Sequence, residues 1–439
     1  MTEKQIAPRA AALGLGALGL LAVSVGPAWS FSQLAQTGPS TNPIVYDHWP
    51  ADKQPIKYFV DPGGTGVAGV DAVDLVRRAF DTWAQVSSST LTFEYGGLIP
   101  DTDGDNNTTV ADIDRGDAFR DDGRIDVIFD DSGVYFDRIA GADNGVIGLA
   151  FPTIELSTGE IRDSDIVISV PNITRFAKDA DLEGVLIHEI GHLCGLGHSG
   201  VYPDVPATQV PTMFPYVGFY GSPAEQRTLT NDDRAGLSQV YPSPSFASDF
   251  GTIRGTITDA QGRGGFGTHI TAVNGNTGEV VGAIAGYFSG NRKSGDYEIP
   301  GLTPGIYEVF IHAIDGGQDA GFVSGFNISE ILRSTYGKAF PKEYFNNTPQ
   351  VSAGTPVTVK ANATTSGVDF VQEFENDGAP LATNVTTTVN GGGQGGGGGG
   401  GGGGGCRVAG PGNGGGANAV LAGLVALAWA VRRRHAGSR

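Results

Sequence analysis

The sequence predicts an α+β domain followed by a region built from strands. Apolar residues recur at helical spacing between Asp71 and Val86, whereas short apolar runs of strand type lie at 126–129 and 165–168. Beyond residue 250 the strand-like runs alternate with polar residues and are separated by turns that contain glycine and proline. With 439 residues, the chain is long enough for two or three domains, each with its own core.

The first 30 residues are typical of a secretory signal peptide. Two basic residues precede an apolar run over 10–25, which the small-residue site Ala28-Trp29-Ser30 follows. We therefore expect an exported protein, either secreted or anchored at the cell surface. Its only cysteines are Cys194 and Cys406, so export is not accompanied by a disulfide framework.

Three helices are expected in the α+β domain. Asp71 is the predicted N-cap of the first, and the apolar face of this helix consists of Val73, Val76, Phe80 and Trp83. The second starts near residue 182, with Asp179 or Asp181 as its cap. The third follows Thr230-Asn231-Asp232-Asp233, whose spacing is that of a variant capping box.

The run His188-Glu189-Ile190-Gly191-His192-Leu193-Cys194-Gly195-Leu196-Gly197-His198 is the most specific motif of the chain. On a helix His188 and His192 are four residues apart, so both imidazoles leave one face and can hold one ion. Gly195 can adopt a left-handed conformation that turns the chain back and makes His198 a third ligand. Three nitrogen ligands leave a fourth position open for water, and Glu189 supplies a base for it.

A catalytic zinc site explains this run better than ordinary helix histidines do. Two histidines one turn apart can be solvated or core residues, but here five positions agree with a single metal site. The remaining histidines of the chain are His48, His269, His312 and His435.

With these residues the chain resembles the metzincin zinc endopeptidases. Their second signature is a methionine in a turn beneath the metal, and Met213 lies in such a position within Pro211–Tyr216. Ser199, directly after the last ligand, is typical of the matrixin branch. The segments 56–59, 79–83, 126–129 and 231–237 are also similar to matrixins. The resemblance covers residues 44–242.

The resemblance implies a twisted mixed sheet with an active-site helix, and hydrolysis of peptide bonds in proteins. Glu189 would take a proton from zinc-bound water, which attacks the scissile carbonyl, and return it to the leaving amine. Phe214, Pro215 and Tyr216 would form the wall of the pocket for the residue after the cleaved bond. Met213 would be a hydrophobic floor, a role that ordinary core packing would explain equally.

Latency is expected to differ from that of typical matrixins. A pro-segment cysteine commonly holds those enzymes inactive, whereas no cysteine lies between the signal peptide and the first strand at Ile56. Cys194 cannot take that role, because two residues after His192 its side chain points about 200° around the helix. We expect Cys194 to be a buried core thiol.

Calcium is a second candidate cofactor. Asp101, Asp103 and Asp105 place oxygens at alternate positions around a glycine, although a solvated acidic turn explains them equally. Asp130, Asp163 and Asp165 fall near the positions where matrixins bind structural calcium. A second zinc is not expected, since no histidine lies between residues 49 and 187.

The net charge of −19 argues against a nucleic acid partner, which would require clustered lysine and arginine. The acidic residues are expected instead to keep an exported protein soluble or to bind calcium.

Residues 250–375 resemble a carboxypeptidase-regulatory-like β-sandwich. The strands are expected at 252–258, 295–307, 357–359 and 367–370, with a turn in the second of these segments. No catalytic constellation is visible in this region, so a spacer or a binding module is expected.

The C-terminus resembles the sorting tails of some Gram-negative bacteria, of the myxobacterial type. Residues 376–416 are a glycine-rich flexible linker, and residues 417–439 contain an apolar run to Val431 and three arginines. In such tails a Gly-Cys motif marks processing and anchoring, here at Cys406, which would attach the protein to the cell envelope at the outer surface. A simple tail anchor is the alternative.

Two classes of function remain from the sequence. The first is a monomeric, exported zinc endopeptidase that acts on proteins and peptides. The second is a non-catalytic surface adhesin on an inactive metzincin scaffold. Retention of Glu189 together with three ligands favours the enzyme, since a scaffold needs neither.

Overall fold

A computed structural model describes the protein over residues 31–33, 46–101, 103–105, 107–108, 112–113, 122–140, 145–155, 158–176, 182–200, 205–217, 226–265, 268–285, 295–312, 342–372 and 407–408. Within these ranges no helix is long and apolar enough to cross a membrane. The predicted signal peptide, the glycine-rich linker and the apolar run of the tail lie outside the described residues, as do Asp179 and Asp181.

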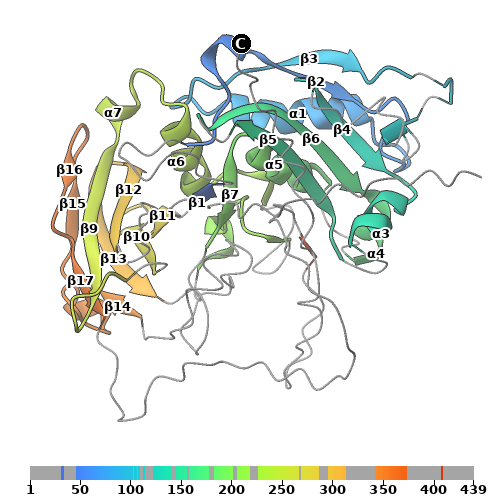
Figure 1. Ribbon diagram of the computed structural model, residues 1–439. Helices are drawn as coiled ribbons and strands as arrows, with labels where there is room; N and C mark the ends of the chain where they lie inside the picture. Colours follow the sequence, from blue (N-terminus) through green and yellow to red (C-terminus); the bar gives the residue numbers. More distant parts are fainter. Residues whose placement is uncertain are drawn as a thin grey trace, which may run out of the picture.

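The N-terminal region is built on a mixed five-stranded sheet with the order β3-β2-β4-β6-β5 (Figure 1). Its strands are β2 (Ile56–Val60), β3 (Phe93–Leu98), β4 (Ile125–Asp130), β5 (Gly148–Glu155) and β6 (Glu160–Ser169). All neighbours pair in parallel except β5, which runs antiparallel to β6 and forms an edge of the sheet. The prediction of a mixed α+β architecture is confirmed.

Two helices pack together beside this sheet. Helix α1 (Ala72–Ala84) begins at Asp71, whose carboxylate accepts the N–H of Asp74 at 2.9 Å, so the predicted N-cap is confirmed. Helix α5 (Leu182–Leu193) carries the histidine motif and is buried from Gly184 to its end. The Trp83 indole N–H donates to the carbonyl of Ile187 at 2.7 Å and fixes α1 against α5.

Short elements surround this core. They are β1 (Phe31–Gln33), η1 (Ala51–Lys53), α3 (Val134–Ala140), α4 (Val170–Phe176), β7 (Leu196–Ser199), η2 (Ala207–Gln209), β8 (Tyr216–Val217), α7 (Phe246–Asp249) and β18 (Arg407–Val408). Strand β1 pairs antiparallel with β7, and β18 pairs in parallel with β8. Tyr135 and Phe136 of α3 pack on the other face of the sheet with Ile128 and Val167.

Helix α6 (Asn231–Val240) begins with the capping box that the sequence predicts. The Thr230 hydroxyl accepts the N–H of Asp233, and the Asp233 carboxylate accepts the N–H of Thr230 at 2.8 Å. Both residues are buried, so the cap satisfies backbone donors that water cannot reach.

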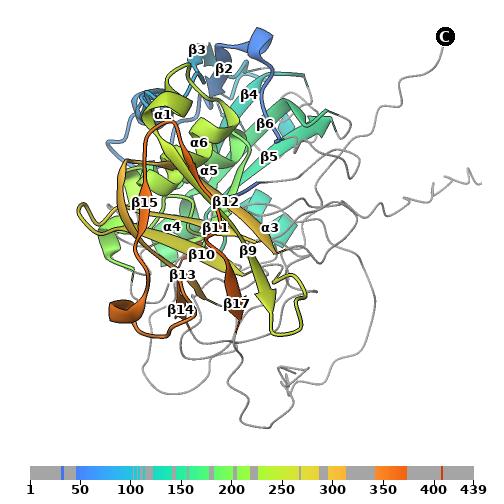
Figure 2. The same cartoon turned by 90° about the vertical axis from the view of Figure 1, so that its left-hand side faces the viewer.

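The described residues between 251 and 372 form two sheets, which we call the C-terminal sheet region (Figure 2). One sheet contains β10 (His269–Asn274), β11 (Val280–Ile284), β13 (Gly305–His312), β14 (Glu343–Tyr344) and β15 (Val357–Val359). The other contains β9 (Gly251–Asp259), β12 (Asp296–Leu302), β16 (Thr364–Thr365) and β17 (Phe370–Gln372). A 3-10 turn, η4 (Val351–Ala353), precedes β15.

The expected strands are present in the C-terminal sheet region, with one shift. The predicted strand at 367–370 begins only at Phe370, because Gly367 has a φ of +81°, which is not a strand conformation.

A single hydrophobic core joins the two regions. Apolar residues of α1 and α5 belong to the same buried cluster as those of α6 and of both C-terminal sheets. Figures 1 and 2 show α6 between the mixed sheet and strands β11 and β12. The C-terminal sheet region is therefore packed against the domain that contains the histidine motif.

Candidate metal centre

Two histidines of α5 face each other one turn apart. The Nε2 atoms of His188 and His192 are 3.1 Å apart, and both side chains are buried. Two nitrogens at about 2.1 Å from one ion with tetrahedral angles would be separated by about 3.4 Å. The pair therefore needs little movement to hold a zinc ion.

Backbone carbonyls orient both rings. The Nδ1–H of His188 donates to the carbonyl of Thr212, and the Nδ1–H of His192 donates to the carbonyl of Leu196, each at 2.7 Å. These hydrogen bonds fix the tautomer that leaves Nε2 with its lone pair for a metal. The carbonyls of two other segments, at Leu196 and Thr212, thus orient the two ligands of α5.

His198 reaches the pair because the chain reverses at Gly195. This glycine has a φ of +91°, as predicted, and a Cβ there would stand 2.3 Å from the carbonyl oxygen of Asp47. Strand β7 then returns toward the helix, and the His198 ring centroid lies 5.3 Å from that of His188 and 4.8 Å from that of His192. One ligand nitrogen from each of the three rings lies within 4.8 Å of the others.

The environment keeps the two histidines of α5 neutral, which is the form that binds a metal. Burial, with a further contribution from His198, lowers the pKa of His188 from 6.5 to about 3. Burial also lowers the pKa of His192 well below its ordinary value. With His198 the donor set is three imidazoles, which suits zinc.

Glu189 lies between the histidines and the edge strand β5. Its side chain is buried, and a Cβ at Gly148 of β5 would stand 2.5 Å from its Oε1 atom. The glycine thus leaves the room that the carboxylate occupies. A carboxylate next to a cluster of histidines, at the edge of a sheet, can exchange protons with a molecule bound there.

Asp233 holds the turn beneath the histidines. Its carboxylate accepts the N–H of Thr212 at 2.9 Å and the N–H of Met213 at 3.0 Å. Because the Thr212 carbonyl orients His188, Asp233 supports a candidate ligand through the turn. Sequence reasoning identified Asp233 only as a helix cap, since no local pattern shows which distant amides a carboxylate will accept.

Comparisons with known proteins agree with this geometry. Residues 48–242 match the matrixin family model. Residues 48–242 form a matrixin-like domain. The chain is also similar to Metalloendoproteinase 2-MMP of Arabidopsis thaliana, with 27% identity over 204 residues, which are 45% of this chain and 44% of the relative. The chain thus spans less than half the length of that curated relative.

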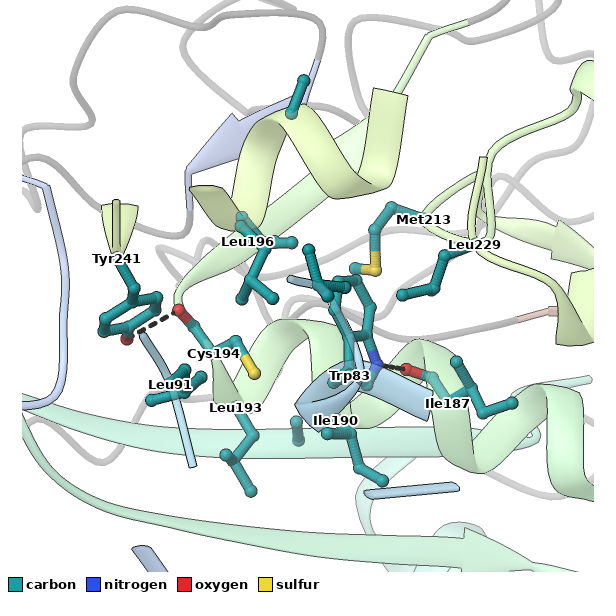
Figure 3. Close-up of a cluster of buried hydrophobic side chains, with 14 of the residues drawn as sticks. Trp83, Leu91, Ile187, Ile190, Leu193, Cys194, Leu196, Met213, Leu229 and Tyr241 are labelled. Carbon is teal, nitrogen blue, oxygen red and sulfur yellow. Dashed lines mark hydrogen bonds between the residues drawn. The ribbon is translucent and has the colours of Figure 1, made fainter. Parts of the chain in front are cut away.

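The hydrophobic cluster beneath the matrixin-like domain's histidines includes Cys194 and Met213 (Figure 3). Cys194 is a buried free thiol, as predicted, and burial raises its pKa well above the ordinary value. The carbonyl of Cys194 accepts the Tyr241 hydroxyl at 2.9 Å, and the carbonyl of Leu193 accepts the Trp49 indole N–H at the same distance. These side chains satisfy the last carbonyls of α5 and fix the end of the helix.

The residues predicted to form a pocket wall follow Met213 directly. Phe214 and Pro215 are buried, and Tyr216 begins β8. Burial alone does not test the predicted pocket wall, which stays a prediction.

The predicted calcium ligands fall into two groups. Carboxylate oxygens of Asp101, Asp103 and Asp105 lie within 4.8 Å of one another, and all three side chains are exposed. Among the described residues, Asp130, Asp163 and Asp165 do not join a cluster of this kind. Asp130 accepts the N–H of Phe136, and Asp165 accepts the N–H of Asp126, so both serve the backbone. Calcium binding stays a prediction.

Proposed function

We propose that the protein is an exported zinc-dependent endopeptidase that hydrolyses peptide bonds in extracellular proteins. The observation that carries the proposal is Glu189, a buried carboxylate that directly follows the candidate ligand His188 on α5 and lies against the glycine of an edge strand. A site that only bound a metal would have no use for an acid at this position.

The edge strand β5 offers a template for an extended substrate. Its pairing to β6 occupies one side, and it is the last strand of the sheet. A peptide adding to the free side would form main-chain hydrogen bonds and place its backbone beside Glu189. Because backbone contacts carry no side-chain information, this arrangement suits an enzyme that acts on many sequences.

The chain's residues then have distinct roles. His188, His192 and His198 would hold the zinc ion through Nε2, where it would polarise the scissile carbonyl and the attacking water. Glu189 accepts the proton of that water and delivers it to the leaving amine. Met213 closes the site from below, and the chain after it, from Phe214 to Tyr216, borders the pocket for the residue that follows the cleaved bond.

The remainder of the chain fits a surface enzyme. We assign the C-terminal sheet region to a carboxypeptidase-regulatory-like β-sandwich, on the basis of its two sheets with a common buried core. The signal peptide and the tail with Cys406 support export and attachment to the cell envelope, with release as an alternative state. We assign a monomer with protein or peptide substrates.

Cleavage of an unfolded, fluorescently labelled protein by the purified full-length chain tests the function. We expect cleavage with one equivalent of zinc, none with a chelator, and recovery when zinc is restored. Glu189→Gln should lower kcat by about 10²- to 10⁴-fold with zinc still bound, since general acid and base catalysis contributes this much.

Glu183→Gln is the matched control, because Glu183 lies on the same helix and pairs with the exposed Arg78 at 3.2 Å. It should leave kcat unchanged. Cleavage that survives in Glu189→Gln would disprove the assigned base. Stoichiometric zinc binding without cleavage of any protein would favour the adhesin.

A further inference from the structure

We propose that the C-terminal sheet region is a positioning component of the metal centre: through Asp232 and His269 it fixes the segment that leaves His198. The proposal depends on the zinc site assigned above, and it gives this region a role beyond that of a spacer. Asp232 and His269 are positioning residues in it, since neither side chain joins the three ligands.

Asp232 connects three parts of the structure through one buried carboxylate. Its Oδ2 accepts the hydroxyl of Ser199 at 2.8 Å, and Ser199 directly follows His198. Its Oδ1 accepts the N–H of Gly282 in β11 at 3.0 Å. The same carboxylate thus binds the ligand segment with one oxygen and the C-terminal sheet region with the other.

His269 provides a second contact on the next residue of that segment. A Cβ at Gly200 would stand 3.2 Å from the Cε1 and Nε2 atoms of His269, so the glycine backbone lies against the edge of the imidazole. His269 is buried and is held from the other side by His312, whose Nε2 is 2.6 Å from its Nδ1. The ring is therefore a rigid stop for the chain after Ser199.

The ligand segment needs such support because it has little structure of its own. Strand β7 has four residues and follows the left-handed Gly195. Within the matrixin-like domain its backbone is bonded at its two ends, where the Leu196 carbonyl accepts the His192 ring at 2.7 Å and the Ser199 N–H donates to the Met213 carbonyl at 2.9 Å. Its strand partner β1 comes from a separate stretch of the chain. Two of the remaining contacts, those of Asp232 and His269, depend on β10 and β11.

The interface that seats these contacts extends along α6. Ala235, one turn after Asp232, packs so closely on Gly301 that a Cβ at the glycine would stand 2.7 Å from the Cβ of Ala235. A larger side chain at Ala235 would therefore displace the C-terminal sheet region without altering a residue of the metal centre. The substitution at Ala235 and the metal centre that is measured are thus separate, which makes the proposal testable.

The experiment compares full-length chains with Asp232→Ala, Ser199→Ala and Ala235→Leu. In the metal-free state, hydrogen exchange over residues 196–200 reports how firmly the segment is held. With Co²⁺ in place of zinc, the visible absorption spectrum and the dissociation constant report the ligand geometry. We expect all three variants to accelerate exchange by at least about tenfold and to weaken Co²⁺ binding by about 10- to 100-fold, as loss of ligand support does.

Two controls separate positioning from general destabilisation. Ser238→Ala removes a buried hydroxyl from the same helix. This hydroxyl forms a hydrogen bond of 2.7 Å with the hydroxyl of Ser88 and contacts none of the three ligands, so the variant should change neither readout. Asp232→Asn keeps an acceptor for Gly282 and should restore part of the protection.

The outcomes distinguish the two proposals. Unchanged exchange and unchanged Co²⁺ affinity in both Ala235→Leu and Asp232→Ala would overturn the positioning role. A wild-type chain that binds Co²⁺ with the expected spectrum and cleaves no protein would overturn only the proposed enzyme, while the exchange measurements would still decide the role of Asp232.

Discussion

The side chain of Met213 occupies the space that a side chain at Gly191 would need. A Cβ at Gly191 would stand 2.2 Å from the Met213 sulfur and 2.9 Å from the nearest ring carbon of Trp83, which is too close for either atom. The glycine inside the histidine motif is thus required by packing, since its own backbone is helical. The methionine thus packs on α5 at Gly191, the residue directly before His192.

This arrangement predicts that Met213 acts through its volume. Met213→Leu conserves volume and should cost less than about 1.5 kcal/mol of unfolding free energy, with metal affinity retained. Met213→Ala leaves a cavity beneath α5 and should cost about 2–5 kcal/mol. Chemical denaturation and zinc titration of both variants measure these effects. Loss of metal from Met213→Leu at wild-type stability would show that the sulfur has a specific role.

Gly195 makes a different demand, because its backbone conformation itself is unusual. Gly195→Ala forces a side chain into a φ of +91° and against the Asp47 carbonyl at 2.3 Å, so we expect more than about 2 kcal/mol of destabilisation and a loss of metal affinity as His198 moves. Gly64→Ala is the control, since Gly64 has a φ of +78° and nothing within 4 Å of its Cβ position. It should cost about 1 kcal/mol. Equal costs for the two variants would contradict the contact with Asp47.

Local patterns in the sequence predicted the parts of the structure that depend on near neighbours. Asp71 and Thr230 cap their helices as expected, because an N-cap needs only a donor two or three residues away. The convergence of the histidines followed from helix geometry and from the freedom of Gly195.

Local sequence patterns did not predict the contacts between distant segments. Asp232 and Asp233 are adjacent and chemically identical, yet one holds Ser199 and Gly282 and the other holds the Met213 turn. Consecutive side chains on a helix point in different directions, so Asp232 and Asp233 meet different partners. Which partners they meet depends on how α6 packs. Strand β17 likewise begins at Phe370 and not at the predicted residue 367, because the backbone of Gly367 has a φ of +81° that the apolar pattern does not reveal.

Asp61 is expected to make stability depend on pH. Burial raises its pKa from 3.8 to about 6, although its carboxylate accepts N–H groups of Gly63, Thr108 and Phe129. A folded-state pKa above the unfolded value means that the folded chain binds the proton more tightly, so this stabilisation is complete below about pH 4 and is lost as the pH rises through 6.

Asp61→Asn should remove that dependence. The difference in unfolding free energy between wild type and variant should change by roughly 2 kcal/mol between about pH 4 and about pH 7, at 1.36 kcal/mol per pKa unit, because the unfolded carboxyl is already partly ionised at pH 4. Urea denaturation at a series of pH values measures it. A difference that stays constant over this range would mean that Asp61 is ionised throughout.

Gly148 is expected to control the position of the catalytic base. Gly148→Ala places a methyl group 2.5 Å from the present position of Glu189 Oε1, so the carboxylate must move by about 1 Å. A displacement of that size lowers kcat by about 10²-fold, because proton transfer depends steeply on geometry. The histidines are unchanged in this variant, so zinc affinity should also be unchanged.

Thr153→Ala, further along the same edge strand, controls for effects on substrate pairing and should leave kcat at the wild-type value. Steady-state kinetics with a peptide substrate, together with zinc titration, separates the alternatives: a rise in KM at constant kcat would place Gly148 in substrate binding, whereas a fall in kcat at constant zinc affinity identifies it as the residue that leaves room for Glu189.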